Sequence, residues 1–264
     1  MCIRASRSVA CILLITTSTS ADFVGVTTVI KDDPDTNFLC TQGNGDFVPG
    51  PLTVCNVFAV FDNPDDVLLS VGAADLQVYS GQSPDVFYQH PFNSTALSPA
   101  CASIPISPDL ICDSFVTIGL KCGPRPPDGD DTKTCSDFDA GEFSTNGHIV
   151  GGWINASPLN GQGDAGTWPD LKVLFLQSSV AQGLSLSGDI HIFWKDDATG
   201  EIFEEPDLPI ECVAVDQDPC ECENGRVTLC HIPPGNLANG RTITVGCAAG
   251  DRHLAHGDAC GPCE

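Results

Sequence analysis

The chain has 264 residues, a hydrophobic content of 42% and a formal net charge of −24 at pH 7. Such strong acidity excludes nucleic acid and anionic lipid surfaces as partners, because both repel a negatively charged protein. The length accommodates one large β domain and a small module.

Residues 1–21 have the features of a secretory signal peptide. Arg4 and Arg7 make the start positive, and the apolar core at 9–15 is too short to span a bilayer. Small residues follow at the end of the segment, as signal peptidase requires. We therefore expect an exported protein, secreted or held at the cell surface, whose mature chain begins near Asp22. No later apolar run predicts membrane insertion.

Residues 22–215 carry the pattern of an antiparallel β domain. Stretches rich in β-branched and aromatic residues alternate with clusters of Gly, Pro, Asn and Asp that favour turns. No long segment has helical periodicity. This pattern is typical of a sandwich or a barrel. We expect an all-β, antiparallel two-sheet sandwich, because the sequence gives no sign that one sheet closes into a barrel. The expected strands are 23–30, 52–61, 67–72, 76–79, 115–120, 148–154, 171–177 and 184–194.

The cysteine content predicts a disulfide-reinforced fold. Of the 15 cysteines, Cys2 and Cys11 leave with the signal and 13 remain. In an exported chain most of them are expected in disulfides, and the odd one is free, paired between chains or bound to a ligand. Cys212 has a candidate partner in the tail. Neighbour pairing, which spacing alone does not fix, gives Cys40–Cys55, Cys101–Cys112 and Cys122–Cys135.

Residues 216–264 begin as an acidic, cysteine-dense linker and continue as a Cys/His-rich module. The stretch 241–245 predicts a strand. A module this short cannot bury a large core, so cross-links are expected to supply much of its stability. Cys230 and Cys263 would close it into a loop, with Cys260 as the alternative partner.

The histidines of this module are a candidate metal site. His253 and His256 are three residues apart, which places both on one face of a single helical turn. His231 follows a cysteine that can tether it nearby, and Asp258 adds an oxygen ligand. Such a set suits zinc or copper(II). The alternative is that these histidines bond turns or face water.

The spacing of the cysteines excludes covalent haem attachment, and the sequence lacks the familiar catalytic motifs. Haem attachment needs C-x-x-C-H, and residues 227–231 lack the first cysteine. Cys260 and Cys263 copy the thioredoxin tetrapeptide without a βαβ unit around it, so we expect structural half-cystines. Nucleophile-elbow, H-E-x-x-H and phosphate-loop motifs are absent from the sequence. We expect a non-enzymatic structural or binding protein, with a metal-dependent hydrolase as an alternative.

Acidic residues between 128 and 142 are a candidate calcium site. Oxygen ligands at such density suit a hard cation, although the spacing is not that of an EF-hand. A solvated acidic loop is the alternative. The candidate ligands are Asp128, Asp130, Asp131, Asp137, Asp139 and Glu142.

Trp168 is the candidate for stacking on a sugar. It precedes a proline in a Gly-rich loop, whereas Trp153 and Trp194 lie in apolar strands and are expected in the core. A carbohydrate-binding module is therefore an alternative function, with a glycan or a cell-surface protein as the partner.

Two parts of the chain resemble known exported proteins. The stretches FAVFDNPDDVLLSVG, FYQHPF and DSFVTIGL resemble a secreted β domain of planctomycete-like and other aquatic bacteria. The stretches VTLCHIPPGN, HLAHGD and GPC resemble a C-terminal module of many exported bacterial proteins, here with Cys247 and Cys260 added. The resemblance implies an exported bacterial β protein and no particular activity.

Overall fold

The computed structural model divides the chain into two compact units, Met1–Val213 and Ala214–Glu264. No helix among the described residues is long and apolar enough to cross a membrane. The structure describes residues 23–31, 33–79, 86–93, 95–123, 131–196, 199–213, 225–231, 240–246, 249–250, 253 and 259–263.

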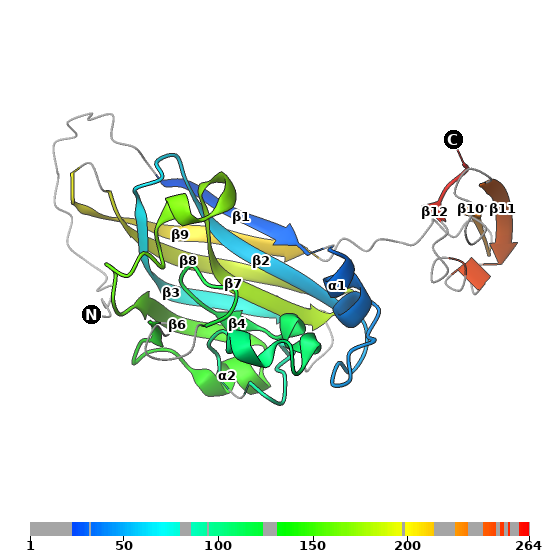
Figure 1. Cartoon of the computed structure of the whole chain (residues 1–264), viewed down its shortest axis with the longest axis horizontal. Coiled ribbons are helices and arrows are strands. Elements are labelled where there is room, and N and C mark those ends of the chain that lie inside the picture. The colour runs from blue at the N-terminus through cyan, green and yellow to red at the C-terminus, as the bar shows by residue number, and fades with distance from the viewer. Residues whose placement is uncertain are drawn as a thin grey trace. The chain divides into compact units, whose positions relative to one another are not determined.

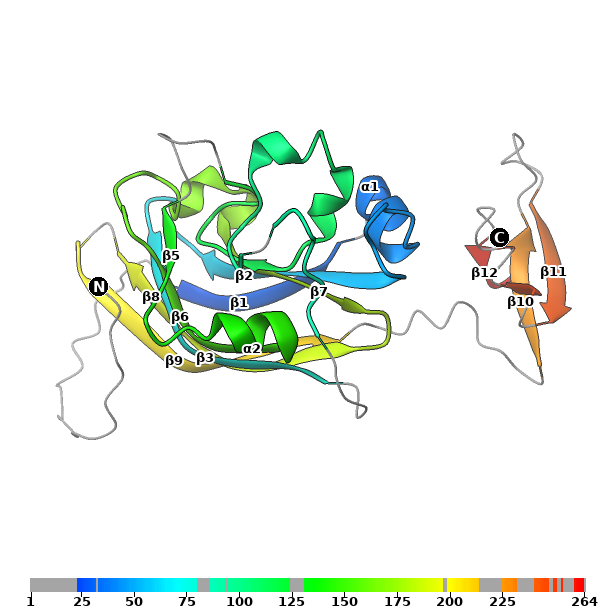
Figure 2. The same ribbon diagram turned by 90° about the horizontal axis from the view of Figure 1, so that it is seen from below.

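The first unit contains two antiparallel sheets packed face to face, which confirms the expected β-sandwich (Figures 1 and 2). Sheet A has the strand order β1-β2-β7-β4, and sheet B has the order β5-β6-β3-β8-β9. Sheet A comprises Phe23–Ile30 (β1), Leu52–Phe61 (β2), Lys172–Ala181 (β7) and Phe115–Val116 (β4). Sheet B comprises Thr132–Thr134 (β5), His148–Asn155 (β6), Val67–Tyr79 (β3), Ser185–Lys195 (β8) and Ile202–Val213 (β9).

The helices of this unit are short. Asp33 caps the first one, because its carboxylate accepts the Thr36 N–H at 3.0 Å, and Pro34 occupies the first helical position. The α-helices are Pro34–Thr36 (α1) and Ala140–Thr145 (α2), with a π-helical turn at Asn37–Thr41. The 3-10 turns are Cys101–Ser103, Pro108–Cys112, Ala165–Thr167 and Pro169–Leu171.

The central strands of sheet A are covered on both faces. On β2, Val57 and Ala59 pack into the main core between the sheets. Leu52 and Val54 point the other way, into a second apolar cluster that includes Tyr88. Figure 2 shows α1 and the 3-10 turns that precede β4 on this outer side. We call this covering the outer layer of sheet A, and it explains why β2 is an almost continuous apolar run.

The strands of the sandwich differ from the expected ones at two places. The stretches 67–72 and 76–79 form one strand, β3, with a register irregularity at Ala73, whose φ is 45°. The stretch 115–120 is extended only at its start. Gly119 has a φ of +72° and a Cβ there would meet the Gln162 carbonyl oxygen at 1.7 Å, so the chain turns against residue 162 where a side chain would collide.

β9 is a strand that the sequence pattern does not predict. Pro206 and Pro209 interrupt it, and Asp207 adopts a φ of 53°. Proline is tolerated in edge strands, and β9 is the edge of sheet B. At its far end β9 approaches β1, where the Thr28 hydroxyl donates to the Glu211 carbonyl oxygen at 3.1 Å.

The cysteine pairs connect distant segments rather than neighbours. The described pairs are Cys40–Cys112, Cys55–Cys212, Cys101–Cys122 and Cys230–Cys263. Cys135 is also disulfide-bonded. The expected pairs Cys40–Cys55, Cys101–Cys112 and Cys122–Cys135 are therefore wrong, and Cys212 has its partner in the sandwich rather than in the tail. Pairing depends on which Cα atoms lie close in space, and strand order decides that.

The second unit has a small three-stranded sheet of its own, with the strand order β11-β10-β12. Val227 and Leu229 are buried against Ile243 and Val245, which is a minimal core. Cys230–Cys263 closes the described part of this unit, as expected. The strands are Arg226–His231 (β10), Arg241–Gly246 (β11) and Ala259–Cys260 (β12).

We predict that residues 22–215 fold without residues 216–264. The main core and both cysteines of the Cys55–Cys212 bridge lie inside this fragment. Under oxidising conditions it should give a β-type circular dichroism spectrum and a cooperative melting transition. A mainly helical spectrum, or no transition, would contradict the prediction.

Within that fragment, the double variant Cys55→Ser/Cys212→Ser should lose about 5 kcal/mol of unfolding free energy in the chain-entropy treatment. The two cysteines are separated by 157 residues. Cys101→Ser/Cys122→Ser is the matched comparison: its separation is 21 residues, for which the same treatment gives about 3 kcal/mol. Guanidinium unfolding measures both, and an equal or reversed order would contradict the loop-length argument.

Candidate functional site

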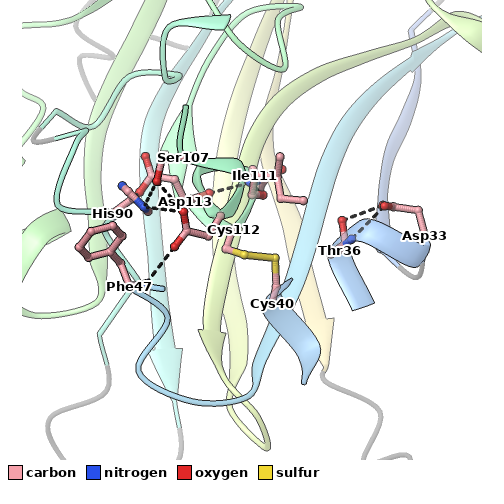
Figure 3. The surroundings of a disulfide bond; sticks show 11 residues. Asp33, Thr36, Cys40, Phe47, His90, Ser107, Ile111, Cys112 and Asp113 are labelled. Carbon is pink, nitrogen blue, oxygen red and sulfur yellow. Dashed lines mark hydrogen bonds and ion pairs between the residues drawn. A yellow bond between two sulfur atoms is a disulfide. The ribbon is translucent and has the colours of Figure 1, made fainter. Parts of the chain in front are cut away.

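A buried polar cluster lies in the outer layer of sheet A. Ser107 and Asp109 flank the start of the 3-10 turn at Pro108–Cys112, and His90 comes from the chain between β3 and β4. The exposed fractions of Ser107, Asp109 and His90 are 5%, 3% and 1%. Figure 3 shows His90 and Ser107 close together, near the Cys40–Cys112 disulfide.

Hydrogen bonds fix the orientation of the His90 ring and the Ser107 hydroxyl. The Phe92 N–H donates to His90 Nδ1 at 3.1 Å, so in this arrangement the ring proton lies on Nε2. His90 Nε2 is 3.2 Å from Asp109 Oδ1 and 3.3 Å from Ser107 Oγ. The Ser107 hydroxyl donates to the same Oδ1 at 2.6 Å. Asp109 Oδ2 accepts the Phe47 N–H at 2.9 Å.

This arrangement differs from a nucleophilic triad. In a triad the carboxylate holds Nδ1 of the histidine, and the serine hydroxyl gives its proton to Nε2. Here a backbone N–H occupies Nδ1, and Ser107 donates to the carboxylate instead of the ring. Nε2 of His90 carries a proton and cannot accept another. The cluster therefore acts as a clamp that holds three chain segments, around residues 47, 90 and 108, against one another.

Asp113 lies beneath the same layer and is fully buried, at 0% exposed. Its Oδ1 accepts the His90 N–H at 2.7 Å, and its Oδ2 accepts the Asn93 amide at 2.6 Å. Burial raises the pKa of Asp113 to about 7, even though the hydrogen bonds from His90, Asn93 and Ser114 lower it. This carboxyl group joins the chain at residues 90–93 to the segment just before β4. Its burial disfavours the ionised form, which has lost its hydration.

Asp109 and Tyr88 respond to the same surroundings in different ways. Burial raises the pKa of Asp109, but the hydrogen bonds from Ser107 and Phe47 and the nearby His90 outweigh it, and the pKa lies below its ordinary value. Burial, followed by the charges of Asp109 and Asp113, raises the pKa of Tyr88. Its hydroxyl is buried and finds no hydrogen-bond partner among the described residues.

Polar side chains also fasten the outer layer to sheet A. Gln177 on β7 donates from Nε2 to the Ile111 carbonyl at 2.9 Å and to the Asp113 carbonyl at 2.6 Å. The Ser179 N–H donates to Ser114 Oγ at 2.9 Å. The Gln177 bonds satisfy backbone carbonyls of irregular, buried chain that has no ladder partner there, and the Ser114 bond joins this chain to β7.

Sequence patterns do not predict this cluster, because its members have no motif spacing. The stretches FYQHPF and DSFVTIGL, which carry the resemblance to a secreted β domain, are the sequence signal that could point to it. The Ser114 N–H donates to the Tyr88 carbonyl at 3.0 Å, and the His90 N–H donates to Asp113. The two segments are hydrogen-bonded to each other in the folded chain. If both recur in a family, their contribution to folding is a sufficient reason.

The candidate metal ligands of the tail are described in part. The rings of His231 and His253 lie with their centroids 5.5 Å apart and their planes nearly perpendicular. His231 follows Cys230, whose bridge to Cys263 holds the end of the chain beside it. His256 and Asp258 lie outside the described residues. The structure thus brings together two of the four candidate ligands.

The candidate calcium ligands serve other local roles where they are described. Asp139 caps α2, and Glu142 lies 3.5 Å from His148 Nδ1. Asp131 accepts a hydrogen bond from Asn160 at 3.0 Å. Within the described ranges, no group of three or more His, Cys, Asp or Glu side chains is arranged to hold a metal ion. Asp137 is exposed; Asp128 and Asp130 lie outside the described residues.

Trp168 is half-buried rather than displayed. Its ring packs against the main core and meets Phe58 edge-on at 6.2 Å. Lys121 Nζ lies 5.7 Å from the ring centroid, in cation–π range, and competes with any sugar for that face. Trp153 and Trp194 are in the core, at 0% and 7% exposed, as expected.

Comparison with known proteins found no matching family, no matching curated protein and no matching solved structure. The resemblance to exported bacterial proteins therefore stays a prediction.

Asp113→Asn should flatten the pH dependence of stability between about pH 4 and pH 7. Folded Asp113 keeps its proton up to about pH 7. The unfolded chain releases it near the ordinary value of about 3.9, so stability falls as pH rises through this window. The variant cannot ionise and should remove up to about 1.4 kcal/mol of that fall per pH unit. Urea unfolding across this range measures the change.

Asp109→Asn is the contrasting variant, because the pKa of Asp109 is lowered. Its ionised form stabilises the fold above the ordinary pKa, and this stabilisation is lost as pH falls through the folded pKa. The variant should lose stability at pH 7 without changing the slope between pH 5 and pH 7. If Asp113→Asn and the unsubstituted protein gave parallel profiles, the raised pKa would be wrong.

Proposed function

We propose that the chain is an exported, non-enzymatic structural or binding protein that acts at the cell surface or outside the cell. The observation that carries this proposal is the disulfide network, in which Cys55–Cys212 spans 157 residues and Cys40–Cys112 spans 72. Such bridges form and persist in oxidising compartments. All four cysteines of these two bridges are at most 5% exposed, so they serve the fold rather than redox exchange.

The geometry of the outer layer supports the non-enzymatic part of the proposal. Ser107, His90 and Asp109 are the residue types of a hydrolase, yet their hydrogen bonds direct the serine proton away from the ring. Phe47 and Phe92, whose rings lie 5.0 Å apart, also contact the His90 ring. The strong acidity of the chain adds solubility outside the cell and favours cations among its ligands.

Export is tested with the signal itself. Expressed with residues 1–21 in a Gram-negative host, the protein should be recovered outside the cytoplasm with an N-terminus near Asp22 and the Cys55–Cys212 bridge formed. Without residues 1–21 it should stay in the cytoplasm with these cysteines reduced. N-terminal sequencing and non-reducing peptide mapping measure both outcomes. A soluble, reduced protein that retains Met1 would sink the proposal.

A second proposal is that the tail binds zinc or copper(II), and the contact of His231 with His253 supports it. Two imidazoles at this separation suit one metal ion, and neutral imidazole is a common ligand of both metals. Further ligands would come from His256 and Asp258, which lie outside the described residues.

Hydrogen exchange of β10 and β11 in the full chain separates metal from disulfide. If metal contributes, a chelator should accelerate amide exchange in both strands, and His253→Ala should copy the effect. A reductant should accelerate exchange in either case, because Cys230–Cys263 closes the module. His148→Ala on β6 is the matched control and should leave the tail unchanged. If the chelator leaves the amide exchange rates of β10 and β11 unchanged, the metal proposal is contradicted.

A further inference from the structure

A cleft lies between α2 and the chain that leads to β4. Its volume is about 560 Å³, which is within the range of small-molecule sites in proteins. Phe138 and α2 contribute one part of its lining, and residues 89 and 95–97 contribute another. The cleft is separate from the clamp around His90, none of whose side chains lines it.

Two phenylalanines give the cleft a rigid apolar part. Phe143 is 1% exposed, and its ring stacks on that of Phe87 with the centroids 5.1 Å apart. Phe138 is half-buried, and its ring centroid lies 6.1 Å from that of Phe143 and 6.3 Å from that of Trp153. Neighbours in the main core thus hold both rings in place, and a ligand can pack against a preformed aromatic surface.

The described lining carries no charged side chain, although 35 of the 264 residues are acidic. The start of α2 offers little to an anion, because the Asp139 carboxylate already accepts the N–H groups of Gly141 and Glu142, at 2.9 and 3.1 Å. An ion of either sign would lose hydration in the cleft without gaining a side chain of opposite charge. The lining therefore favours a neutral ligand.

Gln89 is anchored so that it offers an acceptor to a ligand. Its Nε2 donates to the Tyr88 carbonyl at 3.3 Å and to the Ser114 carbonyl at 2.7 Å. With the amide N–H groups engaged, Oε1 is the atom that Gln89 has left for a further hydrogen bond.

The hydroxyl groups of the lining act in the same way. Ser144 donates to the Gly141 carbonyl at 3.2 Å, and Thr95 donates to Asn93 Oδ1 at 3.2 Å. Each hydroxyl has then used its hydrogen and keeps lone pairs as an acceptor. The polar side chains of the cleft thus suit a ligand that donates several O–H groups.

We propose that the cleft binds a neutral sugar unit of a glycan. Sugar hydroxyls donate to acceptors of this kind, and the C–H face of a sugar ring packs on aromatic side chains. A purely apolar ligand would leave Gln89 and the hydroxyl groups without partners once water is displaced. The site adds a ligand class to the proposed function, whose export and disulfide tests involve no sugar.

The test applies the full, disulfide-bonded chain to an array of neutral and acidic glycans. The neutral glycan that binds best is then titrated as the free oligosaccharide, and saturation-transfer NMR reports contact and the dissociation constant. We expect neutral glycans to be bound and their acidic counterparts to be left in solution, because the lining has no cation to pair with them.

Three variants locate the binding in the cleft. Ala140→Trp fills the cleft from an exposed position and should abolish binding. Ser144→Ala removes one acceptor and should weaken binding about fivefold, the effect of one neutral hydrogen bond. Thr145→Ala is the matched control, because its hydroxyl donates to the same Gly141 carbonyl from an exposed position on α2 but does not line the cleft. It should bind like the unsubstituted protein.

Circular dichroism and melting curves show whether each variant folds. If Ala140→Trp fails to fold, Thr95→Val removes a hydroxyl from the other part of the lining and should also weaken binding about fivefold. The proposal is overturned if no neutral glycan binds, if acidic glycans bind equally well, if folded Ala140→Trp binds normally, or if Thr145→Ala weakens binding as much as Ser144→Ala does.

Discussion

The structure depends on one constraint: the central strands of sheet A are buried on both faces. One face is covered by sheet B, whose backbone N–H and C=O groups bond one another between neighbouring strands. The other face is covered by irregular chain, whose backbone polar groups need separate partners once they leave water. Gln177, Asp109 and Asp113 supply some of those partners. The buried polar residues of this layer are therefore the condition for covering β2 and β7 with loops.

The disulfides follow the same division into layers. Cys40–Cys112 fastens the outer layer to itself beside the Asp113 carboxyl group, and Cys55–Cys212 joins a central strand of sheet A to the edge strand of sheet B. Each bridge connects elements that strand order, not sequence, makes neighbours.

The sequence predicts strands wherever apolar side chains reveal a buried face, as at 52–61 and 171–177. It does not predict β9, because Pro206, Pro209 and several carboxylates hide an edge strand that only its neighbour β8 defines. The clamp around His90 could not be predicted either, since its partners come from separate turns and share no spacing. The burial of Trp153 could be predicted, because a large apolar indole within an apolar strand is stabilised by packing into the core.

The position of Cys212 has a mechanical consequence. It lies at the end of β9, and the chain leaves the sandwich one residue later. Tension applied through the tail would reach Cys212 after only the terminal Val213–Ser185 pair of β9, and the covalent bond would pass it to Cys55 on β2, a central strand of sheet A. The strand would then be loaded across the whole sandwich instead of being peeled from its edge. A tethered protein with this layout resists pulling through a bond that only a reductant can weaken.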